Sequence, residues 1–281
     1  MIRYVYPDGF EFSADEEFIN PEECPNGCRH IYVPPKYRWD RRQTLLRSVV
    51  PKKARSRTAL TWNAALAHLL SEFILGESHG VFPILSLDFE SYEHDHSRLL
   101  ELGLYSAQWH CGGYQLKPNP LLGSRHYVFM ENEHLRNRDY VQDARDHFVF
   151  GETTFAKAPK IRKRFREQLD NAGFVFVFNA SAEIDYAATL GVDLTQYPLI
   201  DVEMLCRFLN GKSSSLRNAC IDHLYKDSQF KDLPPGVWNR PEVLSRSIPL
   251  HNAGNDAVLT ALLGMSLTLK HLSSEKLLTL E

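Results

Sequence analysis

The amino-acid sequence predicts an α/β protein, in which a five-stranded mixed sheet is flanked by helices and preceded by an irregular N-terminal extension. Short apolar runs of strand length, such as residues 81–89 and 174–178, alternate with longer segments whose apolar residues recur every three to four positions. The first part of the chain is instead rich in proline, charge and aromatic residues, without clear periodicity. We therefore expect an extension at residues 1–79 and a folded domain at residues 80–281.

The composition is ordinary for a protein with a core, since 43% of the 281 residues are hydrophobic. The net charge of -3 shows no overall basic excess, although basic residues gather in residues 36–57 and 157–166. An odd number of scattered cysteines and the lack of an apolar leader or membrane-length run favour an intracellular protein with no membrane partner, in the cytoplasm or the nucleus. Cys24, Cys28 and His30 lack a fourth zinc ligand at a familiar spacing.

Five strands are expected. Residues 81–89 form a short apolar run bounded by acids, which is typical of a buried central strand. Residues 99–109 and 126–130 are predicted to be antiparallel neighbours. Residues 174–178 are wholly apolar, and residues 199–202 supply the last strand.

Helical periodicity predicts one helix in the extension and four in the domain. Residues 158–172 have a basic face, which is either solvent-exposed or a contact for phosphates. The predicted helix at residues 181–190 ends at Gly191, a typical C-terminal stop. A loop with four prolines is expected at residues 227–249. The predicted helices are residues 58–75, 158–172, 181–190, 215–225 and 255–272.

Two carboxylates end the first strand. Asp88 and Glu90 are two residues apart, so their side chains project to the same face. Like charges at this spacing repel and are costly to bury unless a cation neutralises them, and oxygen ligands suit Mg²⁺. The alternative is a solvated strand end without a metal.

A second polar motif opens the last predicted helix. His251 has a pKa suited to a general base, and Asp256 follows in the first turn. The alternative is that an Asp or Asn here caps the helix while His251 packs nearby.

The order of strands and helices, together with these motifs, resembles the DEDDh family of 3′→5′ exonucleases, and is most similar to its fungal exonuclease-like branch. The motifs are Asp88-Phe89-Glu90, Glu101-Leu102-Gly103 on the next strand, and residues 251–257 (HNAGNDA). Residues 133–137 (EHLRN) and 148–152 (FVFGE) are also similar to that branch. The resemblance implies a ribonuclease H-like fold, two divalent cations (Mg²⁺ or Mn²⁺) and release of nucleotides from a free 3′ end of single-stranded RNA or DNA.

Transferred residue by residue, the resemblance implies that Asp88 bridges both cations. Glu90 and Asp256 would complete the first cation site, and His251 would act as the general base. Such a set supports two-metal phosphodiester hydrolysis.

The middle motif departs from the family pattern, which has Gly-His-Asn and then Asp four residues after the Asn. Here Phe178 replaces the histidine, and the position four residues after Asn179 is Glu183. We expect Glu183 to be the acid near the metal, with Asp185 as the alternative. Phe89 and Asn179 are expected to contact the terminal nucleotide.

Three functions follow from this pattern. The first is a metal-dependent 3′→5′ exonuclease. The second is a nucleic-acid-binding or scaffold protein on the same fold, catalytically impaired because Glu183 replaces Asp. The third is an enzyme that cleaves small phosphodiesters.

Overall fold

The structure, a computed structural model, describes residues 3–5, 11–13, 81–110, 116–117, 123–197, 199–210, 213–224 and 248–271. The predicted helix at residues 58–75, the cysteines and histidine at residues 24–30, and most of the predicted loop at residues 227–249 lie outside these ranges. Among residues 1–79, β1 (Arg3–Val5) and β2 (Glu11–Ser13) pair in antiparallel fashion.

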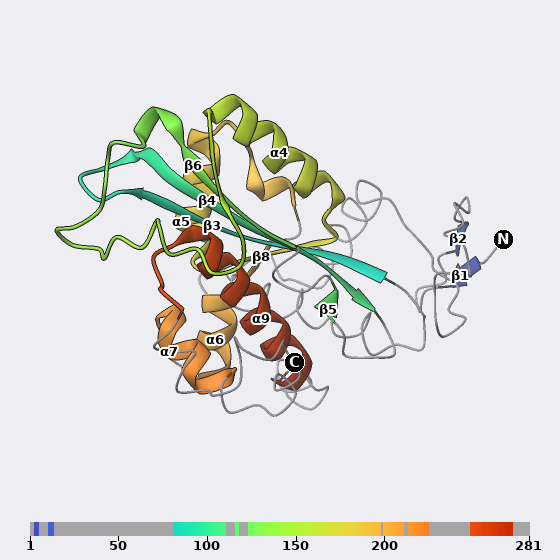
Figure 1. The fold of residues 1–281 in the computed structure, drawn as a ribbon. Helices are drawn as coiled ribbons and strands as arrows, with labels where there is room; N and C mark the ends of the chain where they lie inside the picture. Colours follow the sequence, from blue (N-terminus) through green and yellow to red (C-terminus); the bar gives the residue numbers. More distant parts are fainter. Residues whose placement is uncertain are drawn as a thin grey trace, which may run out of the picture.

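The core of the domain is a mixed sheet in the order β7-β6-β4-β3-β8-β9, with β5 paired to β4 (Figure 1). The strands are β3 (Val81–Tyr92), β4 (Asp95–His110), β5 (Leu116–Lys117), β6 (Ser124–Phe129), β7 (Thr153–Ala156), β8 (Phe174–Val177) and β9 (Leu199–Asp201). β3, β4 and β6 are antiparallel neighbours, whereas β8 and β9 continue parallel to β3. This confirms the predicted α/β class and all five predicted strands.

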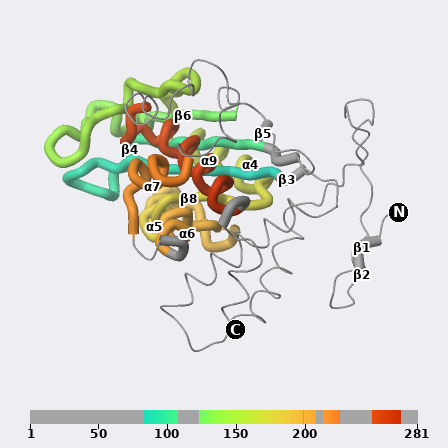
Figure 2. The backbone as a smooth tube through the Cα atoms, turned by 90° about the horizontal axis from the view of Figure 1, so that it is seen from below, coloured from blue at the N-terminus to red at the C-terminus, as the bar shows by residue number. Residues whose placement is uncertain are grey.

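Helices cover both faces of this sheet (Figures 1 and 2). On one face lie α4 (Ala158–Asn171) and α5 (Ala180–Thr189), and on the other lie α6 (Val202–Asn210), α7 (Leu216–His223) and α9 (Ala253–His271). Two 3-10 helices, η2 (Met130–Asn132) and η3 (Leu194–Gln196), lie in the connections. None of the helices in the described ranges combines the length and the apolar character needed to cross a bilayer.

Side chains along β3 point alternately to the two faces of the sheet, and each face packs into a separate hydrophobic core. Leu85 and Leu87 are fully buried among α4 and α5, while Ile84 packs with α9 on the opposite face. Asp88 and Glu90 continue the α9 side of the strand. The central strand therefore ends with its carboxylates beneath the helix that closes the domain.

A sheet of five strands was an underestimate, and one helix was also missed. β7 has the burial pattern of an edge strand, with exposed residues at two of its four positions, so it shows no apolar run. β5 has only two residues. α6 follows β9 without a break, and its start is set by Asp201, whose carboxylate accepts the backbone N–H groups of Glu203 and Met204.

The N-terminus of α9 packs directly on β4 because of two glycines. A Cβ atom on Gly103 would overlap the backbone of Ala253, and one on Gly254 would come within 2.6 Å of the Phe148 ring. Any larger residue would push the first turn of α9 away from the sheet. This close approach positions the last predicted motif above β3 and β4.

Candidate metal centre

Three carboxylates meet where β3 ends beneath α9. Asp88 and Glu90 come from β3, and Asp256 comes from the first turn of α9. One oxygen from each lies within 4.8 Å of the others. Residues more than 160 positions apart in the sequence thus form one acidic cluster, as the sequence predicted.

This cluster holds buried polar atoms that the protein leaves without partners. Among the described residues, the buried side-chain atoms that lack a hydrogen-bond partner are Asp88 Oδ2, Asp256 Oδ1 and Thr260 Oγ1. A buried carboxylate oxygen without a donor is costly, and native structures nearly always pair such atoms. When the two carboxyl groups are ionised, a ligand that carries positive charge would satisfy these oxygens.

The electrostatics of the cluster lead to the same conclusion. Burial raises the pKa of Asp88 well above its ordinary value, and the neighbouring carboxylates, chiefly Glu183 and Asp256, raise it further. Burial also raises the pKa of Glu90, and it raises the pKa of Asp256 to about 7. The acids repel one another in a site with little water, so ionising all of them requires a counter-charge.

Glu183 lies at the edge of this cluster. It is buried in the first turn of α5, and its Oε2 accepts the backbone N–H of Phe89 at 3.1 Å. Burial raises its pKa, which Asp201 and Asp256 raise further although the Phe89 hydrogen bond opposes them. Glu183 faces the acids, as the sequence favoured, but it is not part of the group whose oxygens lie within 4.8 Å.

Asp185, the alternative to Glu183, lies elsewhere. It is exposed, and it lines a cavity of about 490 Å³ together with Asn179 and Tyr186. Asp185 lies two positions after Glu183, which rotates it to another side of α5. Asn179 is in the left-handed region (φ 69°), where its backbone N–H donates to Asp201, and its predicted contact with a nucleotide stays a prediction.

The structure places the Phe89 ring away from the acids, and the expected contact of Phe89 with the terminal nucleotide stays a prediction. The ring is 4% exposed and packs against Phe165 and Tyr186, with centroids 5.7 and 6.3 Å away. Because side chains alternate along a strand, the residue between Asp88 and Glu90 projects to the opposite face. Only the Phe89 backbone lies near the acids.

His251 lies at the open side of the cluster. Its side chain is 49% exposed, and its Nδ1 lies 3.9 Å from Oε1 of Glu90. Its backbone has a positive φ of 64°, and its N–H donates to Oδ2 of Asp256 at 2.9 Å. Burial and then the charge of Arg217 lower the pKa of His251, which favours the neutral imidazole that can accept a proton.

A network of asparagine side chains holds this turn in place. Asn252 caps α9, since its Oδ1 accepts the Asn255 N–H at 3.1 Å, and its Nδ2 donates to the carbonyls of Ala144 and Arg145. Asn255 in turn donates to the carbonyl of His147. The capping alternative therefore applies to Asn252, which leaves Asp256 facing the acids.

Glu101 lies behind the cluster and is paired. It is buried on β4, its Oε2 lies 2.9 Å from Nε2 of His126 and accepts the Ala253 N–H, and its Oε1 accepts the Arg145 Nε–H at 3.4 Å. This buried ion pair joins the sheet, α9 and the loop that carries Arg145. Its role was not evident from the sequence, because the three partners are at least 19 residues apart.

The donor set fits a hard divalent cation. Asp88, Glu90 and Asp256 offer only carboxylate oxygens, including two that are buried and unpartnered. Mg²⁺ and Mn²⁺ take such oxygen ligands and usually retain water. These three residues would hold a cation, with Glu183 at the edge.

We expect the metal-free protein to lose stability as the pH rises. The folded-state pKa of Asp256, about 7, lies above its unfolded value of 3.8, so the folded protein binds more protons between these values. Its Tm should therefore fall between about pH 5.5 and about pH 8 in EDTA. Mg²⁺ or Mn²⁺ at about 100 times its Kd should add about 2.7 kcal/mol, which raises Tm by roughly 5–10 °C.

Differential scanning calorimetry at both pH values, with EDTA or with each cation, measures these changes. The cation-induced increase in Tm should be larger at the higher pH, because protons compete for the same oxygens. The double variant Asp88→Asn/Asp256→Asn is the control and should lose the cation effect and the part of the pH dependence that comes from these two residues. Equal cation effects in the variant and the wild type would mean that the cation binds elsewhere.

The comparisons with known proteins agree with this geometry. The family described as DNA polymerase III subunit epsilon-like, C-terminal domain (DEDDh_C) matches residues 83–229, just over half of the chain. A search of curated proteins finds no match. The matched range includes Asp88, Glu90 and Glu183, whereas His251 and Asp256 lie beyond it and join them only through the fold. The chain therefore belongs to the DEDDh exonuclease family, and its mixed sheet flanked by helices is a ribonuclease H-like fold.

Proposed function

We propose that this protein is a metal-dependent 3′→5′ exonuclease that hydrolyses single-stranded RNA or DNA, and that it belongs to the fungal exonuclease-like branch. The observation that carries the proposal is the cluster of Asp88, Glu90 and Asp256, with its buried unpartnered oxygens and a half-exposed, neutral His251 beside it. The similarity of the segment around His251 supports the assignment to that branch.

Each residue has a defined part in this proposal. Asp88, Glu90 and Asp256 hold two divalent cations, Mg²⁺ or Mn²⁺, and Glu183 contributes from the edge of the cluster. The cations supply charge stabilisation for the phosphoryl oxygens and activation of water. His251 accepts the proton of the attacking water, because its lowered pKa favours the uncharged imidazole and its turn is fixed by Asp256.

We expect the wild-type protein with Mg²⁺ or Mn²⁺ to release mononucleotides from a 3′-labelled single-stranded oligonucleotide. His251→Ala should slow this reaction by about 10²–10⁴-fold, because the general base is removed. His134→Ala is the matched control, since His134 is exposed and lies outside the cluster, and it should digest the strand at the wild-type rate. Intact strand with both cations would contradict the proposal.

A second function is favoured by one specific contact. Glu183 already uses Oε2 to accept the Phe89 N–H, which reduces what it can offer a cation. On this reading the protein binds nucleic acid or a partner without efficient turnover. Glu183→Asp should then increase hydrolysis from a low wild-type level, whereas rapid wild-type turnover would exclude this function.

The length of the substrate separates the exonuclease from an enzyme for small phosphodiesters. An exonuclease should degrade a long oligonucleotide at least as efficiently as a dinucleotide, measured as kcat/KM. The reverse order would favour the small substrate.

A further inference from the structure

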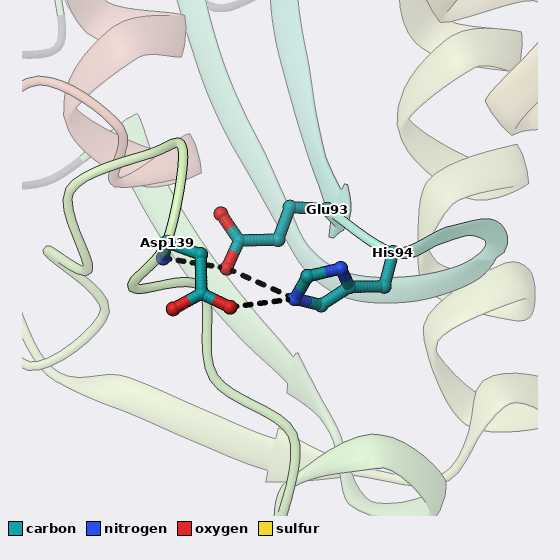
Figure 3. A group of neighbouring side chains, drawn as sticks. All are labelled: Glu93, His94 and Asp139. Atoms are coloured by element: carbon teal, nitrogen blue, oxygen red, sulfur yellow. Dashed lines mark hydrogen bonds and ion pairs between the residues drawn. The ribbon is translucent and has the colours of Figure 1, made fainter.

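The tip of the β3–β4 hairpin carries an organised group of side chains that the proposed function does not use. Glu93 and His94 form the two-residue turn between β3 and β4. Figure 3 shows both side chains directed toward Asp139 on the neighbouring loop, and His94 Nε2 lies 2.9 Å from Oδ2 of Asp139. The three residues have donor atoms close enough to hold a cation.

Glu93 is, however, already fully engaged by the backbone. Its Oε1 accepts two N–H groups and its Oε2 accepts two more, from the four consecutive residues 138–141, at 2.8–3.0 Å. These bonds use the acceptor capacity of both oxygens. Desolvation raises the pKa of Glu93, but the four N–H groups outweigh it and lower the pKa to about 2. The group therefore organises a loop rather than holding a metal.

Asn137 attaches the same loop to β3 a second time. Its Oδ1 accepts the Glu93 N–H and its Nδ2 donates to the Ser91 carbonyl, each at 2.9 Å. Six hydrogen bonds thus fix residues 137–141 on the end of the central strand. A loop held this firmly has a defined position relative to the acidic cluster.

This fixed loop presents an exposed aromatic ring. The Tyr140 residue is 80% exposed, and its ring contacts His94 with centroids 5.6 Å apart at 65°. The His94 ring in turn contacts the Tyr92 ring, with centroids 5.2 Å apart, so the rings of Tyr92, His94 and Tyr140 form a continuous series from the end of β3. A T-shaped contact uses only one face or edge of the Tyr140 ring, which leaves the rest open to a flat ligand.

The first of these rings, that of Tyr92, lies on the same strand as Asp88 and Glu90. At about 3.3 Å per residue, Tyr92 lies about 7 Å beyond Glu90. The register of β3 against β4 shifts between Glu90 and Tyr92, and such bulges occur next to active sites, where they redirect side chains. A strand whose 3′ end occupies the cluster therefore has its next nucleotides within reach of these rings.

The charges around the rings determine what part of a strand can bind there. Glu93 and Asp139 are acidic and close, so a phosphate is disfavoured at this position. An uncharged aromatic base is not disfavoured there, because stacking on tyrosine needs no charge and tolerates every base. The surface fits the base of a single-stranded nucleotide.

We propose that Tyr140, held by the Glu93-organised loop and by His94, stacks an unpaired base of the substrate strand upstream of the nucleotide being removed. This inference rests on the proposed exonuclease function. It adds a substrate-binding position outside the acidic cluster. Because stacking acts on ground-state binding, loss of the ring should raise KM more than it lowers kcat.

The test measures binding, so it does not depend on turnover. The probe is a fluorescein-labelled oligothymidylate with phosphorothioate linkages at its 3′ end, titrated in Mg²⁺ and followed by anisotropy. Tyr140→Ala should weaken binding by about 5- to 150-fold, whereas Tyr140→Phe retains the ring and should bind like the wild type. Phe155→Ala removes another exposed aromatic residue, on β7, and should leave binding unchanged.

Abasic strands identify stacking itself. For the wild type, an abasic residue at one of the upstream positions should weaken binding by a similar factor, and the same strand should bind Tyr140→Ala no worse than the intact strand does. Equal binding by Tyr140→Ala and Phe155→Ala, or a Tyr140→Ala effect that no abasic residue reproduces, would overturn the proposal. Failure of the hydrolysis assay with binding retained would instead count against the proposed exonuclease alone.

Discussion

Asp88→Asn should abolish hydrolysis and at the same time stabilise the metal-free protein. Burial and then four neighbouring carboxylates raise the pKa of Asp88, and its Oδ2 is buried without a partner. Replacing it with an amide removes a cation ligand worth several kcal/mol in the transition state, so the rate should fall by at least about 10³-fold. Without a cation, the same change removes repulsion among buried acids, and Tm near neutral pH should rise.

The rate of hydrolysis is expected to fall while Tm rises, and this combination distinguishes a cation ligand from a residue that only supports the fold. A residue that merely supports the fold would lose activity and stability together. Digestion of a labelled strand and thermal unfolding in EDTA measure the two effects separately. Asp185→Asn is the matched control on α5, because Asp185 is exposed and outside the cluster, and it should keep near-wild-type activity. A large loss in Asp185→Asn, with little in Glu183→Gln, would reinstate Asp185 as the acid near the metal.

Arg145→Met should be the most destabilising of the changes considered. Arg145 is 1% exposed, its Nε–H donates to Glu101, and its Nη atoms donate to the carbonyls of Glu133 and Leu135 at 2.8 and 2.7 Å. Its loss leaves the buried Glu101 carboxylate with one charged partner fewer, which costs about 3–5 kcal/mol. The corresponding decrease in Tm is roughly 6–20 °C for a domain of this size.

Arg136→Met provides the control, because it breaks an ion pair in the same loop at a more exposed position. Arg136 is 28% exposed and bonds Asp143 and Asp146, so its replacement should cost about 0–1 kcal/mol. Adding Glu101→Leu to Arg145→Met should recover part of the lost free energy of unfolding, since the buried Glu101 carboxylate is then also removed. Urea unfolding of all four proteins measures these differences. Equal costs for Arg145→Met and Arg136→Met would mean that the buried pair contributes no more than the surface pair.

Elements with a strong local pattern were predicted well from the sequence. The apolar run at the centre of β3 and the three-to-four spacing of α4 and α9 are signals that survive in any tertiary context. β7 and α6 were missed for a physical reason. β7 is stabilised by pairing with β6 rather than by its own apolar content, and α6 begins because Asp201, a residue of the preceding strand, caps it.

The candidate site was predicted only in part. Asp88, Glu90 and Asp256 were found because alternation and helix spacing fix which way their side chains project. The same alternation places the Phe89 ring on the opposite face, where Phe165 and Tyr186 pack against it. Glu101 and Arg145 were not recognised as a pair, because each contact depends on a distant segment of the chain.

The sequence by itself therefore determined the α/β class, the ribonuclease H-like resemblance and the candidate metal-binding acids, because these depend on periods of two and 3.6 residues and on short motifs. Only the tertiary structure showed that Glu183, and not Asp185, lies beside the other acids, since this depends on which side of α5 faces the end of β3. It also decided what holds Asp256 in place. The close approach of α9 at Gly103 and the buried Glu101–Arg145 pair are interactions between segments that no local pattern encodes.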